Sequence, residues 1–167
     1  NMLIYNNKFS VVPITTHQTL KKALKKIDKG LIIKKVLSLN NDYKKMLKKK
    51  PKIALLGMNP HNSELKKTSE EIKIIKPCVN FLRKKKIKID GPFSSDQMFL
   101  NKMYNKFDVI VGMYHDQVLT PLKIISGFDA INITLGLKYI RISPDHGTAK
   151  DLINKNSSNY KSLLNSI

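Results

Sequence analysis

Short apolar runs rich in β-branched residues alternate along this chain with longer segments whose apolar residues recur at helical spacing. Such alternation is typical of an α/β fold, in which helices pack on a largely parallel sheet. The segments that predict strands are 9–14, 52–58, 108–113, 130–134 and 139–142, and those that predict helices are 20–27, 32–46, 68–86, 149–153 and 160–167. Gly30 and Pro51 should end the first two helices, and Pro77 should kink the third or mark a new start.

The formal net charge of +19 invites a nucleic-acid interpretation. However, only Arg83 and Arg141 of the 31 basic residues are arginine, and Lys, Ile and Asn together make up 64 of the 167 residues. These three residues have A/T-rich codons, so a base-composition bias explains the charge. The lysine runs 48–50 and 84–86 contain no aromatic residues for base stacking. We therefore expect a solvated basic surface and no dedicated nucleic-acid site.

Three further classes of protein are disfavoured by the sequence. A single cysteine, Cys78, rules out an internal disulfide framework. No run of 18 apolar residues is present, so no membrane-spanning helix and no membrane partner are expected. The first residues show no signal-peptide pattern, and a cytoplasmic location is the default expectation.

Three of the four histidines each follow a different predicted strand. His17 ends the string TTH, His61 ends the string NPH, and His115 lies in MYHDQ. Ligands of open α/β sheets bind beyond the carboxyl ends of the strands, and divalent metals often take three imidazoles. The pattern alone leaves two alternatives open, a three-histidine metal site or ordinary capping and hydrogen-bonding histidines.

Further polar residues lie downstream. Lys123 and Asn132 stand in apolar surroundings, and Arg141 is an arginine where a lysine would match the bias. Arg141 either serves an anionic ligand through its fork of donors or forms a surface salt bridge. The string SPDHGTAKD at 143–151 either offers backbone N–H groups to an anion or simply caps a helix.

Taken together, these strings resemble the 4-hydroxythreonine-4-phosphate dehydrogenase family of pyridoxine biosynthesis. The shared strings, in order, are TTH, LGMNPH, EEI, GPFSSDQMF, MYHDQ, LK, INITLGL and YIRISPDHGTA. The resemblance covers Thr15 to about Asp151. It implies a three-layer α/β/α fold like that of the isocitrate and isopropylmalate dehydrogenases, and a homodimer that shares its active sites.

The resemblance also implies a role for each candidate residue. The divalent-metal ligands, for Zn, Mg or Co, would be His17, His61 and His115. The substrate-binding residues would be Lys123, Asn132 and Arg141. The catalytic and metal-supporting groups would be Lys123, Asp116 and Asp96. The residues that contact NAD would be His146, Gly147, Thr148 and Ala149.

The implied reaction is NAD-dependent oxidation of 4-phosphohydroxy-L-threonine, a phosphorylated amino acid, followed by decarboxylation to 3-amino-2-oxopropyl phosphate. A divalent metal suits this chemistry because it lowers the pKa of the bound hydroxyl and polarises the ketone. The pathway would be the biosynthesis of pyridoxal 5'-phosphate. Lys123 suits proton transfer or enolate stabilisation.

Two departures from the family keep a second hypothesis open. The glycine-rich stretch expected after NPH reads Asn62-Ser63-Glu64-Leu65-Lys66, and the one expected after DHGTA reads 152–156, LINKN. Family members are about twice as long, so we expect residues 1–167 to be the C-terminal part only, with the N-terminal half missing. The alternative function is a non-catalytic remnant or basic binding module derived from that enzyme.

Overall fold

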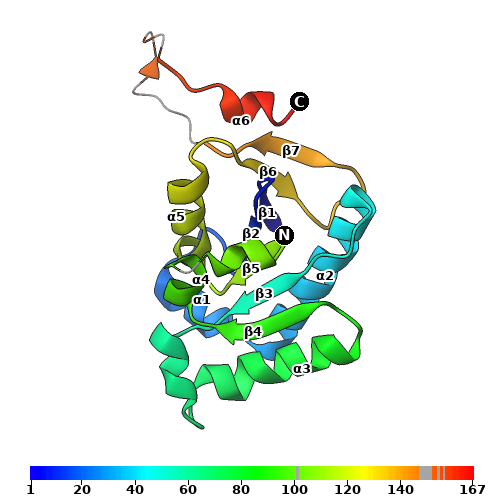
Figure 1. Cartoon of the computed structure of the whole chain (residues 1–167), viewed down its shortest axis with the longest axis vertical. Coiled ribbons are helices and arrows are strands. Elements are labelled where there is room, and N and C mark those ends of the chain that lie inside the picture. Colours follow the sequence, from blue (N-terminus) through cyan, green and yellow to red (C-terminus); the bar gives the residue numbers. More distant parts are fainter. Residues whose placement is uncertain (101, 147–151, 154, 156) are drawn as a thin grey trace.

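The computed structural model describes residues 1–100, 102–146, 152–153, 155 and 157–167. Within them, seven strands form one sheet in the order β4-β3-β5-β2-β1-β6-β7 (Figure 1). The strands are β1 (Met2–Tyr5), β2 (Ser10–Pro13), β3 (Ile53–Leu56), β4 (Ile89–Phe93), β5 (Val109–Gly112), β6 (Ile131–Thr134) and β7 (Arg141–Pro144).

The sheet is mixed, and the expectation of a largely parallel sheet holds for only one side of it. Strands β4, β3, β5 and β2 are parallel neighbours, whereas β1 is antiparallel to both β2 and β6, and β6 is antiparallel to β7. The difference arises from β1, a strand that the sequence patterns did not predict. Only residues 6–9 connect it to β2, and so short a connection permits only antiparallel pairing.

Helices cover both faces of the sheet, as expected for a three-layer α/β/α fold. The α-helices are α1 (Leu20–Lys26), α2 (Lys29–Leu47), α3 (Lys76–Lys84), α4 (Ser95–Leu100), α5 (His115–Ser126) and α6 (Lys161–Leu164). Shorter helical turns are η1 (Pro60–Leu65), η2 (Glu71–Ile75) and η3 (Met103–Lys106). In Figure 1, α3 lies beside β4 at one edge of the sheet and α6 beside β7 at the other.

Two hydrophobic clusters fill the space between the layers. Val12 and Leu55 point to one face of the sheet and pack with residues of α2 and α3, whereas Val11 and Leu56 point to the other face and pack with α4 and α5. Neighbouring strand residues thus bury opposite faces. This arrangement explains why the strands appear in the sequence as continuous apolar runs.

Several helix boundaries differ from the expectations. Gly30 does not stop a helix but lies in the first turn of α2, because the Asp28 side chain caps that helix by accepting a hydrogen bond of 2.7 Å from the Leu31 N–H. Helix α2 ends at Leu47, before Pro51. Pro77 marks a new start, since it lies in the first turn of α3, which follows η2 directly.

The elements β4, α4 and α5 were not predicted, because α4 has only six residues and the other two contain residues that disrupt simple patterns. Strand β4 includes Gly91 and Pro92, and α5 carries Pro121 in its interior. The helix expected at 149–153 falls largely outside the described residues, and the one expected at 160–167 contains α6. No helix in the described part of the chain is long and apolar enough to cross a membrane.

Candidate active site

Most of the candidate residues lie at one end of the sheet, along the border formed by the strand termini and not beside an outer strand. The parallel strands β2, β3, β4 and β5 end at this edge, and they are followed by His17, His61, Asp96 and His115 respectively. In open α/β sheets this edge is where ligands bind. We refer to it below as the histidine edge.

His17 and His115 lie side by side at the histidine edge. Their ring centroids are 5.5 Å apart, and the ring planes meet at 43°. Two imidazoles that ligate one zinc ion through nitrogens about 2.0–2.1 Å from the metal, at a tetrahedral angle, hold their centroids about 5 Å apart. The separation of these two rings therefore fits two ligands of one divalent ion.

Each of two histidines has a carboxylate at its Nδ1 atom. Asp116 Oδ1 lies 2.7 Å from Nδ1 of His115, and Asp96 Oδ2 lies 3.4 Å from Nδ1 of His61. These contacts leave the Nε2 atom of each ring as the nitrogen available to a metal. A carboxylate behind a ligating imidazole is a frequent arrangement in metal sites, because it fixes the orientation of the ring.

His61 and Asp96 line a pocket of about 260 Å³, together with Ser94, Tyr114 and Gln117. Hydrogen bonds from the Ser94 hydroxyl and from the Gln97 backbone N–H, with a smaller contribution from nearby His61, hold the pKa of the Asp96 carboxyl below its ordinary value. Asp96 is therefore an anion at neutral pH.

Within the described residues, no group of three or more His, Cys, Asp or Glu side chains is arranged to hold a metal ion. One chain thus brings His17 and His115 together, while His61 lies with Asp96 in the neighbouring pocket. Convergence of all three histidines on one ion was expected in a dimer, and a single chain does not test it.

The loop after β3 has an unusual backbone. Residues 61–64 have φ between 48° and 55°, and Leu65 has a φ of 54°. This is the left-handed region, which glycine enters freely and other residues enter at a cost. The segment is the one in which the resemblance calls for glycines, and this chain has a left-handed loop here without them.

Glu71, for which no role was predicted from the sequence, holds the start of this loop against the sheet. Its buried carboxylate accepts hydrogen bonds of 2.8 Å from the backbone N–H groups of both Met58 and Asn59, and a longer one from the Asn59 side chain. Burial raises the pKa of Glu71, but the hydrogen bonds outweigh burial and lower it. The available signal was its place at helical spacing on the apolar face of the helix expected at 68–86, four residues before Ile75.

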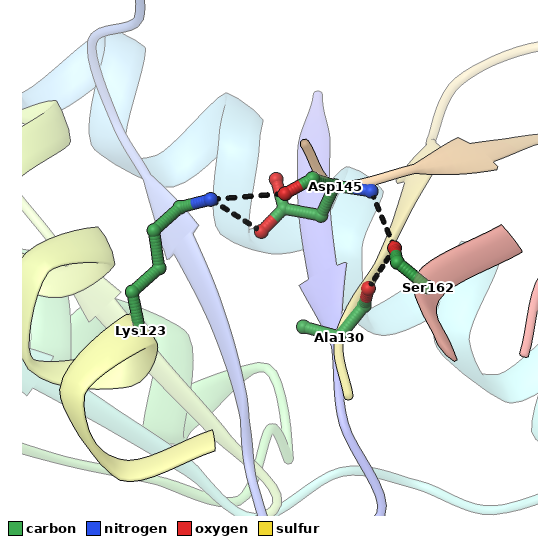
Figure 2. Close-up of polar contacts among 4 residues, drawn as sticks. All are labelled: Lys123, Ala130, Asp145 and Ser162. Atoms are coloured by element: carbon green, nitrogen blue, oxygen red, sulfur yellow. Dashed lines mark hydrogen bonds and ion pairs between the residues drawn. The ribbon is translucent and has the colours of Figure 1, made fainter. Parts of the chain in front are cut away.

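Lys123 lies away from the histidine edge. It is on α5, eight residues after His115, which corresponds to about 12 Å along the helix axis. Its ammonium donates to the carbonyl oxygen of Asp145 at 2.9 Å and lies 3.1 Å from the Asp145 carboxylate (Figure 2). Asp145 follows β7 next to the start of β6, at the opposite edge of the sheet.

A serine of the C-terminal helix completes this cluster. The backbone N–H of Asp145 donates to Ser162 Oγ at 2.7 Å, and the Ser162 hydroxyl donates to the carbonyl oxygen of Ala130 at 2.6 Å (Figure 2). Ser162 is fully buried. It therefore anchors α6 to the ends of β6 and β7.

Asn132 and Arg141 lie on the paired strands β6 and β7. Arg141 pairs with Thr134 at the histidine edge, is exposed, and donates a hydrogen bond of 3.0 Å to the Thr134 hydroxyl. The Asn132 Oδ1 atom is buried and has no hydrogen-bond partner among the described residues. A buried amide oxygen without a partner is suited to accept a hydrogen bond from a ligand.

Of the residues expected to contact NAD, only His146 is described, and it is exposed. Gly147, Thr148 and Ala149 lie outside the described residues.

Comparison with known proteins identifies the family. Residues 1–167 match the family described as pyridoxal phosphate biosynthetic protein PdxA. The chain belongs to the PdxA family. It is 44% identical, over 99% of its length, to a 4-hydroxythreonine-4-phosphate dehydrogenase from Sulfurihydrogenibium sp., and covers 52% of that protein. It is also 37% identical, over 90% of its length, to a D-threonate 4-phosphate dehydrogenase from Pectobacterium atrosepticum, and covers 47% of that protein.

A solved structure has the same fold. The crystal structure of a 4-hydroxythreonine-4-phosphate dehydrogenase from Klebsiella pneumoniae superposes on 99% of this chain with a TM-score of 0.84, at 35% identity, and the match covers 50% of that chain. This PdxA chain thus spans about half the length of the curated relatives that it matches. The resemblance to the family is confirmed, as is the α/β fold.

Proposed function

We propose that this PdxA chain forms the C-terminal part of a metal- and NAD-dependent dehydrogenase that acts on 4-phosphohydroxy-L-threonine. The reaction is oxidation of the secondary alcohol and decarboxylation to 3-amino-2-oxopropyl phosphate, in pyridoxal 5'-phosphate biosynthesis. The observation that carries the proposal is the His17–His115 pair at the histidine edge, with ring centroids 5.5 Å apart, in a chain whose relatives are named dehydrogenases of phosphorylated substrates.

His17 and His115 would hold a divalent ion such as Zn, Mg or Co, and His61 would supply the third imidazole, from the other subunit of a homodimer. Asp116 and Asp96 would orient His115 and His61 from their Nδ1 sides. When bound, the ion supplies Lewis-acid stabilisation of the substrate oxygen. NAD would accept the hydride, with His146 and residues 147–149 contacting it.

The substrate carries a phosphate and a carboxylate, which require cationic and hydrogen-bonding partners. Arg141, exposed at the histidine edge, offers a planar pair of donors for either group. The Asn132 side chain would bind a polar group of the substrate. Lys123 would bind substrate or move a proton once its ammonium has left the Asp145 carboxylate, which it contacts in this conformation.

A second candidate function is a non-catalytic remnant of such an enzyme. The left-handed loop without glycines beside His61 favours it, as does the engagement of Lys123 by Asp145. The D-threonate 4-phosphate dehydrogenase relative also makes D-threonate 4-phosphate an alternative substrate.

The test is NADH formation with a divalent metal and either 4-phosphohydroxy-L-threonine or D-threonate 4-phosphate. The 167-residue chain is assayed by itself and together with the part of the Sulfurihydrogenibium relative that it does not cover. We expect little turnover by the chain alone and measurable turnover of 4-phosphohydroxy-L-threonine by the mixture, because catalysis requires metal, cofactor and substrate to be held together. No turnover of either compound by the mixture would favour the remnant, and faster turnover of D-threonate 4-phosphate would reassign the substrate.

A further inference from the structure

A continuous series of hydrogen bonds connects the three strand ends that carry the histidines. It runs from β2 to β5 through the side chain of Thr15, and from β5 to β3 through the side chain of Gln117. Neither residue was assigned a role from the sequence, although both lie in strings shared with the family.

Thr15 connects the segments that carry His17 and His115. Its hydroxyl donates to the carbonyl oxygen of Met113 at 2.9 Å, and its backbone N–H donates to the same oxygen at 3.2 Å. Thr15 is 4% exposed, so water does not compete strongly for these bonds. Thr15 and Met113 each stand two residues before a histidine of the pair. The bond from the Thr15 hydroxyl to the Met113 carbonyl oxygen therefore joins the two segments that carry these histidines.

Gln117 connects the segments that carry His115 and His61. Its Oε1 atom accepts from the backbone N–H of Met113 at 2.7 Å, and its Nε2 atom donates to the carbonyl oxygen of Gly57 at 2.8 Å. Gly57 is the first residue after β3, at the start of the segment that leads to His61. The bridge needs a donor and an acceptor on one side chain, which glutamine has and an ionised glutamate lacks.

The close approach of α5 to the strand end depends on Gly112. A Cβ atom at residue 112 would lie 2.5 Å from Cγ1 of Val118 and 3.1 Å from Oε1 of Gln117. The absence of a side chain at this position allows the first turn of α5 to rest on β5. Gln117 can therefore reach backbone groups of both β5 and the segment after β3.

We propose that Thr15 and Gln117 are positioning residues that do not touch the metal. Thr15 sets the spacing of the His17–His115 pair that would hold a divalent ion, and Gln117 sets the position of the segment that carries His61, which would serve the ion of the partner subunit. The inference rests on the proposed function for its metal, but the arrangement of the histidines can be measured without metal. Groups that orient ligands typically change metal affinity by about 10–100-fold when they are removed.

The first experiment compares Thr15→Val with Thr15→Ser in the full chain. Valine has nearly the shape of threonine but lacks the hydroxyl, whereas serine keeps the hydroxyl and loses a methyl group. In the metal-free chain we expect the nuclear Overhauser effect between the rings of His17 and His115 to weaken in Thr15→Val and to persist in Thr15→Ser. With Co²⁺, we expect about 10–100-fold weaker binding and an altered absorption spectrum in Thr15→Val only.

The second experiment compares Gln117→Glu with Thr120→Ala. Glutamate keeps the acceptor for the Met113 N–H but repels the Gly57 carbonyl oxygen, so it breaks only the connection to the His61 segment. We expect the His61 ring resonances to shift and Co²⁺ binding to weaken, while Thr120→Ala, at an exposed position of the same helix, behaves as the parent chain does.

Urea unfolding of every variant ensures that the comparisons are made on folded protein. Should the parent chain fail to bind Co²⁺, the proposed metal role fails. The positioning role is then decided by two signals of the metal-free chain, the nuclear Overhauser effect between the His17 and His115 rings and the His61 ring resonances. Unchanged ring signals in both Thr15→Val and Gln117→Glu would overturn the positioning role, whether or not Co²⁺ binds. The positioning role would likewise be overturned if Thr15→Ser lost the ring contact as fully as Thr15→Val.

Discussion

The Lys123 ammonium lies 3.1 Å from the carboxylate of Asp145 and donates a hydrogen bond to the carbonyl oxygen of the same residue, at the edge of the sheet opposite to the histidines. The Asp145 side chain is 13% exposed and that of Lys123 is 47% exposed. In this conformation the Lys123 side chain is therefore engaged in a structural contact with Asp145. An anionic substrate would have to compete with Asp145 for it.

Ser162 holds Asp145 in this arrangement through the Asp145 backbone N–H. Replacing it by alanine leaves the Asp145 N–H without its acceptor and the Ala130 carbonyl oxygen without its donor. We expect Ser162→Ala to lower the free energy of unfolding by about 1–3 kcal/mol, because buried polar groups lose their partners. Urea denaturation measures the loss, and amide hydrogen exchange at Asp145 should accelerate.

The control for this prediction is Ser157→Ala, which removes an exposed hydroxyl that donates a local hydrogen bond to the Lys155 carbonyl oxygen. Its effect on stability should be within about 0.5 kcal/mol. Equal stability of Ser162→Ala and Ser157→Ala would show that α6 is not anchored through Ser162.

The left-handed loop predicts a stabilising substitution. Glu64 is exposed and has a φ of 50°, a conformation that costs a residue with a side chain about 1–2 kcal/mol. Glycine avoids this cost, but it loses more conformational entropy on folding, which offsets part of the gain. We therefore expect Glu64→Gly to raise the free energy of unfolding by up to about 1 kcal/mol. The matched control is Lys34→Gly, at an exposed position inside α2, which should lower it by about 1 kcal/mol. Losses of similar size in both variants would contradict a left-handed loop.

Asp108 predicts a pH dependence of stability. Its carboxylate accepts from the Lys49 ammonium at 2.6 Å and from the Lys52 N–H at 2.7 Å. Burial raises the pKa of Asp108, but these bonds outweigh burial and hold it below the ordinary value. Because the pKa in the folded state is the lower one, the stabilisation is complete above the unfolded-state pKa of about 3.9 and is lost as pH falls through the folded-state value.

We expect Asp108→Asn to lower the free energy of unfolding by about 1–2 kcal/mol at pH 7. The difference between the variant and the parent chain should shrink as the pH falls below about 4, where the parent carboxylate becomes protonated. Urea titrations between pH 7 and pH 3 measure this difference. A difference that stays constant over this range would assign the stabilisation to groups other than the Asp108 carboxylate.

The sequence predicted most of the strands, and the apolar runs of β2, β3 and β5 follow from burial on both faces of the sheet. It did not predict β1, whose four residues MLIY are too few to show a period, or the antiparallel pairings that β1 creates. Strand β4 was hidden by Gly91 and Pro92, and α5 by Pro121. In β4 and α5 tertiary contacts decide the element, and local propensity opposes it.

The candidate site was predictable to a similar degree. His17, His61 and His115 were selected because they follow strands, and strand order then places all three at one edge. Their supports were harder to find, because Thr15, Glu71 and Gln117 act on backbone groups that are distant in the sequence. The pairing of Lys123 with Asp145 depends on β7 returning antiparallel along β6, which the apolar pattern does not reveal.

Asp116 provides the last prediction. Its Oδ1 atom lies 2.7 Å from Nδ1 of His115, and a carboxylate in this position strengthens and orients an imidazole that binds a metal through Nε2. We expect Asp116→Asn to weaken Co²⁺ binding by about 10–100-fold. His115→Ala should weaken binding further, because it removes the ligand itself. Asp129→Asn, an exposed aspartate near α6, is the control for a lost charge and should bind Co²⁺ as the parent chain does. Titration followed by visible absorption distinguishes these outcomes, and equal affinities in Asp116→Asn and Asp129→Asn would remove Asp116 from the metal site.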